Sequence, residues 1–219
     1  MRAESRDARH AGVPVKHLFT EGRAFGTILL WIPYFMNLLI IYFIGSWLPA
    51  LLRQVGMTTA AGATATAFFS FGGVVACLIE GALIKRRGAY FVLLVEFGLA
   101  TLFIAGLSKI PSSYALMLAV TFLSGFLVIG AQAGLNALAA NYYPTAVRST
   151  GVGWALGVGR IGSIVGPLLG GWFLKIGWTP GQILLFGTVA AASAFVAILL
   201  SRIGGRATAY HDGATIAAH

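Results

Sequence analysis

The sequence is poor in the residue types that build catalytic and metal sites. It has one cysteine, Cys77, and only six acidic residues among 219, so no disulfide can form within the chain. All four histidines lie outside the apolar stretches, which leaves no buried base or metal-ligand cluster for an enzyme that acts within a membrane. We therefore predict that the protein is not an enzyme and uses no metal or cofactor.

Charge is also scarce. Charged residues make up 10% of the chain and hydrophobic residues 58%, whereas soluble domains have roughly 25% charged residues. The net charge of +9 could suggest nucleic acid as a partner, but the basic residues cluster between the apolar stretches. The composition therefore predicts an integral membrane protein that binds no nucleic acid.

Six apolar stretches are long enough to cross a lipid bilayer, which takes about 20 helical residues. Open sheet edges cannot be satisfied in lipid, so each stretch is expected to form a helix. The predicted fold class is all-α, with a transmembrane bundle at 25–201 between segments 1–24 and 202–219. The six spans are expected at about 25–52, 60–84, 89–107, 112–140, 149–174 and 181–201.

The lysines and arginines are unevenly distributed between the two sides of this bundle. Of 15, eleven fall in segments on one side (1–24, 85–87, Arg148, Arg202 and Arg206) and three on the other. By the positive-inside rule, both termini are expected in the cytoplasm, with the protein in the cell's inner membrane.

The remaining cation, Arg160, interrupts the apolar run between Arg148 and Lys175. It lies 12 residues past Arg148, or roughly 18 Å along a helix. A charge near the bilayer centre costs about 3 kcal/mol or more, so such residues usually face a protein or water-filled interior and pair with an anion. The guanidinium is therefore either a ligand-binding group or a structural arginine that bonds helix carbonyls or pairs across a helix interface.

Other polar side chains are expected at a similar depth. Asn37 lies on the first span, and Gln132 and Asn136 share one face of the fourth. With Arg160 to clamp a carboxylate, the amides to bond a ring hydroxyl and Tyr42 to stack on a ring, they form a predicted binding site for an aromatic acid. The alternatives are interhelical hydrogen bonding by the amides and simple packing of the tyrosine.

Two carboxyl groups, Glu80 and Glu96, also fall within spans, near the expected cytoplasmic end. We expect local ion pairs with Lys85, Arg86, Arg87 or Arg148, which would form a cytoplasmic gate. Proton carriage by Glu80 is the second interpretation, because burial favours the protonated form of a carboxyl group.

Two segments carry a resemblance to the major facilitator superfamily. Residues 141–153 (NYYPTAVRSTGVG) resemble a superfamily loop of the form acidic-x-x-Pro-Thr-x-x-Arg-x-Thr-Gly, with Asn141 at the acidic position. Residues 81–88 (GALIKRRG) are similar to the cytoplasmic loop Gly-x-Leu-x-Asp-Arg-x-Gly, with Lys85 in place of the aspartate. Both departures remove an acidic gate partner.

A closer resemblance is to the aromatic acid:proton symporter family. It is carried by LFTEGR, LLWIPYFMNLL continuing to SWLP, GAQAGLNALAA and GVGRIG, at residues 18–23, 29–49, 130–140 and 157–162. The resemblance implies proton-coupled symport of a small aromatic or organic carboxylate such as 4-hydroxybenzoate.

The resemblance also implies a twelve-span transporter of which these six spans match the C-terminal half, with residues 1–24 similar to the end of the central loop. The N-terminal six-helix half, where the family carries its acidic proton-coupling residue, is then a missing partner. We expect a fragment rather than a half that pairs with a separate chain. The alternative to transport is an inactive truncated half or a membrane scaffold.

Overall fold

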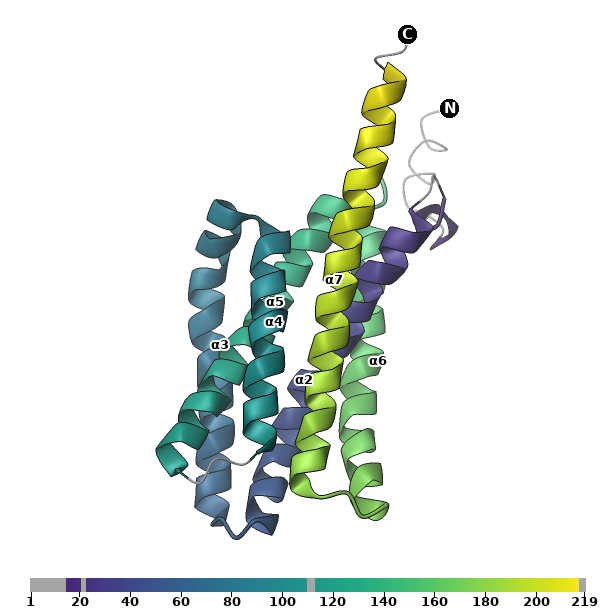
Figure 1. Ribbon diagram of the computed structural model, residues 1–219. Coiled ribbons are helices and arrows are strands. Elements are labelled where there is room, and N and C mark those ends of the chain that lie inside the picture. Colours follow the sequence, from purple (N-terminus) through teal and green to yellow (C-terminus); the bar gives the residue numbers. More distant parts are fainter. Residues whose placement is uncertain (1–14, 21–22, 110–112, 217–219) are drawn as a thin grey trace, which may run out of the picture.

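The computed structural model describes residues 15–20, 23–109 and 113–216, with residues 204–216 described by their backbone alone. A short 3-10 helix, η1 (Val15–Leu18), precedes six long α-helices (Figure 1). All six are long and apolar enough to cross a membrane, so the predicted all-α fold with six spans is confirmed. The helices are α2 (Ala24–Gln54), α3 (Thr59–Arg87), α4 (Ala89–Ser108), α5 (Tyr114–Tyr142), α6 (Arg148–Lys175) and α7 (Pro180–Ile216).

The last helix is longer than its apolar stretch. The span-like part of α7 is Pro180–Ile203, but the helix continues to Ile216 through the segment expected to be a tail. Hydropathy marks where a helix leaves the apolar layer, and a helix need not end at that point. At the other terminus, residues 1–14 and 21–22 of the expected loop segment lie outside the described residues.

The six helices pack in a pattern with two-fold symmetry. The main contacts of α2 are with α6 and α7, those of α5 are with α3 and α4, and α4 also packs on α7. Exchanging α2 with α5, α3 with α6 and α4 with α7 reproduces this set of pairs. Because successive helices run antiparallel, the two triplets have opposite directions, which is the arrangement of an inverted-topology repeat. It places α2 and α5 at equivalent central positions.

Glycines bring α6 into direct contact with the backbone of α2. Gly162, Gly166 and Gly170 recur every four residues and are all buried. A Cβ atom on Gly166 would lie 2.6 Å from the carbonyl oxygen of Leu39 on α2. Small residues permit such close approach where lipid supplies no hydrophobic drive between helices. The indole of Trp47 reinforces the pair by donating a hydrogen bond to the Pro167 carbonyl at 2.8 Å.

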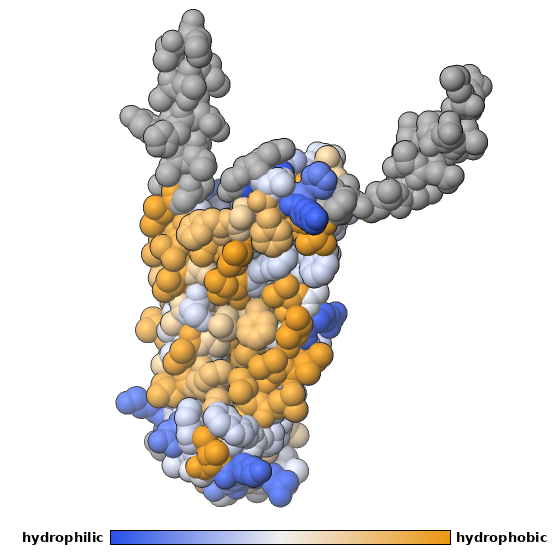
Figure 2. All heavy atoms as spheres, turned by 90° about the vertical axis from the view of Figure 1, so that its right-hand side faces the viewer, coloured by the Kyte–Doolittle hydropathy of each residue, from blue (hydrophilic) through white to orange (hydrophobic). Residues whose placement is uncertain are grey.

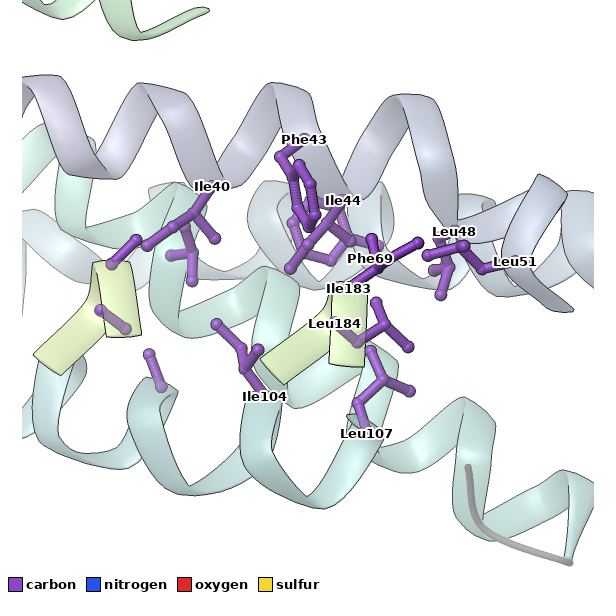
Figure 3. Packing of buried hydrophobic residues seen from close by; sticks show 14 of the residues in the cluster. Ile40, Phe43, Ile44, Leu48, Leu51, Phe69, Ile104, Leu107, Ile183 and Leu184 are labelled. Carbon is purple, nitrogen blue, oxygen red and sulfur yellow. The ribbon is translucent and has the colours of Figure 1, made fainter. Parts of the chain in front are cut away.

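The core is apolar and so is the outer surface. Figure 3 shows side chains of α2, α3, α4 and α7 meeting in the core, with Phe43, Ile104 and Ile183 fully buried. Figure 2 shows an apolar band across the middle of the visible face, with most hydrophilic groups toward the ends of the bundle. Large apolar side chains are exposed on the helices, among them Leu78 and Leu168 with 79% and 68% of their area exposed. This inside-and-outside hydrophobicity is that of a multi-pass membrane protein.

Candidate functional site

Polar side chains of α2 and α5 meet in the middle of the bundle. The side-chain amide of Asn37 donates from Nδ2 to Oε1 of Gln132 at 3.1 Å, and the Tyr34 hydroxyl donates to Oδ1 of Asn136 at 2.9 Å. Asn37 and Tyr34 are fully buried, Gln132 is half-buried and Asn136 is exposed. The predicted shared face of Gln132 and Asn136 therefore lies against α2.

The hydrogen bond between the Asn37 and Gln132 side chains leaves one buried atom of each amide without a partner among the described residues. Oδ1 of Asn37 and Nε2 of Gln132 are both buried and have no hydrogen-bond partner among the described residues. One is an acceptor and the other a donor, and buried polar atoms without partners are costly. A ligand hydroxyl, which both donates and accepts, matches the pair.

Arg160 lies at the contact of α6 with α2. Its Nη1 donates to the hydroxyl of Tyr42 at 3.4 Å, and both side chains are exposed. A Cβ on the neighbouring Gly159 would lie 3.2 Å from the carbonyl oxygen of Tyr34 and 2.8 Å from Leu38. Arg160 therefore follows directly on the point where α6 touches the segment of α2 that holds Asn37.

No intramolecular anion neutralises Arg160 within the described residues. The carboxyl groups described there are Glu80 and Glu96, and none of their oxygens has a hydrogen-bond partner. A guanidinium has five N–H donors in a planar fork that matches a carboxylate, and the contact with Tyr42 uses one. The structural alternative of an ion pair within this bundle therefore has no support here.

The expected ion pairs of Glu80 and Glu96 with basic residues are wrong. Both carboxyl groups are buried, with 1% and 4% of their residue area exposed, whereas Lys85 and Arg86 are exposed. Arg148 instead donates from Nε to the Tyr143 carbonyl at 3.3 Å. The reason is that both glutamates turn inward onto α5, away from the solvated end of the bundle.

The segment after α5 is fixed by its tyrosines. Tyr143 is buried, and a Cβ on Gly151 of α6 would meet its ring at 2.5 Å. Burial raises the pKa of the Tyr143 hydroxyl. The hydroxyl of Tyr142 donates to the Arg23 carbonyl at 3.2 Å, which ties the start of α2 to the end of α5. Residues 141–153, the segment that resembles a superfamily loop, therefore connect α2, α5 and α6.

A double-mutant cycle tests the contact between α2 and α5. Replacing Asn37 and Gln132 with alanine, singly and together, should show a coupling energy of about 0.6 kcal/mol, with about 1.7 as the upper end for such bonds in membranes. The measurement is the unfolding free energy of the purified chain in detergent. Asn37→Ala combined with Asn141→Ala is the control, and it should be additive within about 0.5 kcal/mol because Asn141 is exposed at the end of α5. Additivity in the first pair would contradict the contact.

The class is a helical bundle of the secondary-transporter type, because it has six membrane-crossing helices, an inverted packing pattern and a polar seam at mid-span. The seam consists of Tyr34, Asn37, Tyr42, Gln132, Asn136 and Arg160. The chain belongs to the Major Facilitator Superfamily, whose family model matches residues 30–212. This agrees with the resemblance of the loop segments.

Curated relatives agree in their printed names. The chain is 41% identical over 194 residues to a gallate transporter of Pseudomonas putida, a match that covers 89% of this chain and 42% of the relative. It is 36% identical over 192 residues to a 4-hydroxybenzoate transporter of Pseudomonas aeruginosa, with 88% and 43% covered. It is also 37% identical over 172 residues to a benzoate transport protein of Acinetobacter baylyi, with 78% and 37% covered. The chain thus spans less than half the length of these relatives, which are named as transporters of aromatic acids.

Proposed function

We propose that the chain forms the C-terminal six-helix half of a proton-coupled symporter for a small aromatic or organic carboxylate, such as 4-hydroxybenzoate. The observation that carries the proposal is the mid-span guanidinium of Arg160, which is exposed and has no carboxylate partner among the described residues. Relatives named for gallate, 4-hydroxybenzoate and benzoate support an aromatic acid as the cargo.

In this proposal each end of the substrate meets a different part of the seam. Arg160 binds the carboxylate through its free donors, with Tyr42 orienting the guanidinium. A ring hydroxyl accepts from Nε2 of Gln132 and donates to Oδ1 of Asn37, the buried atoms that lack partners in the described chain. Asn136, already bonded to Tyr34, forms the edge of the site.

The proposal includes the membrane context. The bundle at 25–201 lies in the inner membrane, with the segments 1–24 and 202–219 in the cytoplasm, as the excess of basic residues on that side favours. A second six-helix half covers the exposed side of Arg160 and completes the binding site. Lys85, Arg86 and Arg148, at the same end, remain gate candidates that would work with that second half.

Uptake of radiolabelled 4-hydroxybenzoate tests the function. Cells expressing this chain together with the N-terminal half of a relative should accumulate the label above vector controls, and a protonophore should abolish the accumulation. The chain expressed alone shows whether the second half is required. If neither format takes up 4-hydroxybenzoate, gallate or benzoate, transport is contradicted and the alternative of an inactive half or scaffold is supported.

A further inference from the structure

The two glutamates within the spans share one level of the bundle. Glu80 lies eight residues before Gly88 and Glu96 lies eight residues after it, on the two helices that meet at this glycine. In an antiparallel pair, residues equidistant from the turn lie at the same height. Each glutamate is seven residues, or about 10 Å, inside its helix end, well past the exposed last turn of α3.

The side chains converge on α5, which packs against both α3 and α4. A Cβ on Gly130 would lie 3.0 Å from Oε1 of Glu96 and 3.5 Å from Oε2 of Glu80. A Cβ on Gly134, one turn further along α5, would lie 3.2 Å from Oε1 of Glu80. Two glycines thus leave the space in which carboxyl groups of two different helices meet.

No other group in the described part of the chain balances the two charges. As carboxylates, both residues present only acceptors, and all four oxygens are buried without a donor from the described residues. Among the packed elements, α5 has no charged side chain, and its titratable groups, Tyr114 and Tyr142, are its first and last residues. The other titratable or charged groups of α3, α4 and α7 with described side chains are Cys77, Lys85, Arg86, Arg87, Tyr90 and Arg202.

None of these six donates to the pair, because the four carboxyl oxygens have no partner among the described residues. Cys77, Lys85, Arg86 and Arg87 are exposed, and the Tyr90 hydroxyl is 3.3 Å from Ser201 Oγ. Arg202 lines a cavity beside Arg87 and Gly88, at the turn between α3 and α4. The two carboxyl groups instead face each other across one point beside Gly130, which lies 3.0 Å from Oε1 of Glu96 and 3.5 Å from Oε2 of Glu80. Two like charges side by side in an apolar interior are strongly unfavourable, and one proton shared between the two groups removes that repulsion.

We propose that Glu80 and Glu96 form a proton-binding site within the bundle, where the two carboxyl groups share one proton. Binding forms an O–H bond on one carboxylate and a hydrogen bond to the other, and release returns the proton to water and leaves two carboxylates. Release therefore requires hydration or opening of the α3–α5 contact. The use of this proton to drive substrate uptake rests on the transport function proposed above, whereas the site itself does not.

Infrared spectroscopy of the chain in phosphatidylcholine vesicles tests the site. At pH 7 the protein should show the C=O band of a protonated carboxylic acid, shifted in heavy water. Since Glu80 and Glu96 are the acidic residues within the spans, the other four provide the background. Glu80→Gln and Glu96→Gln should each lose the band, because the new amide donates the hydrogen bond that the proton supplied. Glu21→Gln, outside the spans, is the matched control and should keep it.

Each result is decisive. A wild-type chain without an acid band at pH 7 would overturn the site with no variant involved. A band that survives in either glutamine variant would indicate a single protonated acid and would also overturn it. The helical amide band in the same spectra shows whether each variant is folded.

The role in coupling has its own readout. In cells that take up 4-hydroxybenzoate, Glu96→Gln should lose accumulation driven by the pH gradient and keep exchange of labelled for unlabelled substrate. Equal accumulation by the variant and the wild type would contradict the role. If the wild type takes up nothing, the proposed transport fails and the infrared result stands independently.

Discussion

Arg160→Lys should weaken binding of 4-hydroxybenzoate by about 10- to 100-fold. The substitution keeps the positive charge and removes the planar fork, so a carboxylate held by two parallel hydrogen bonds retains one at best. A hydrogen bond to a charged group contributes about 1.5–3 kcal/mol, and each 1.4 kcal/mol is a factor of ten. If Arg160 were needed only for its charge, lysine would serve almost as well.

The measurement is the Kd of radiolabelled 4-hydroxybenzoate in membranes of the assembly that takes it up. Arg53→Lys is the matched control, because Arg53 is also exposed on a span but lies in the last turn of α2, away from the seam. It should bind as the wild type does. Unchanged binding by Arg160→Lys would contradict the two parallel hydrogen bonds to the carboxylate. Unchanged binding by Arg160→Ala would remove this residue from the site and leave the amides as its basis.

The helices could be predicted from the sequence because their main determinant is local. Apolar stretches of about 20 residues bounded by polar gaps have one solution in lipid, so the six spans followed from hydropathy alone. The end of α7 did not follow, since its residues beyond Ile203 are helical without being apolar. Which helices touch could not be predicted either, because α2 meets α5 and α6 across about a hundred residues of chain.

The seam was partly predictable, because local spacing can be read from the sequence and tertiary packing cannot. The four-residue spacing of Gln132 and Asn136 fixed a shared face, but their partners Asn37 and Tyr34 depend on tertiary packing. For Glu80, nearness in sequence was misleading. Lys85 is five residues away, which on a helix of 3.6 residues per turn is about 140° around the axis, nearly the opposite side. The equal spacing of Glu80 and Glu96 about Gly88 was the sequence signal for their pairing, and it needed α5 to bring them together.

The glycine contact of α6 on α2 determines where Arg160 lies. A substitution at this contact should therefore affect substrate binding as a substitution of the arginine does. Gly166→Ala places a methyl group 2.6 Å from the Leu39 carbonyl oxygen and 3.3 Å from the Phe43 nitrogen, both on the α2 backbone. Backbone cannot rotate away as a flexible side chain can, so α6 must shift outward. We expect a loss of unfolding free energy of about 1–3 kcal/mol, the usual cost of overpacking.

Gly157→Ala is the matched control on the same helix, because a Cβ there meets nothing within 4 Å. Alanine is favoured over glycine in helix interiors by about 1 kcal/mol, so this variant should be as stable as the wild type or more stable. The measurement is thermal unfolding of both purified variants in detergent, followed by substrate binding. Because Arg160 lies six residues from Gly166 and contacts Tyr42 of α2, displacement of α6 should weaken binding together with stability. If Gly166→Ala is as stable as Gly157→Ala, then α6 and α2 are not in backbone contact. That result would also contradict the position of Arg160 against α2.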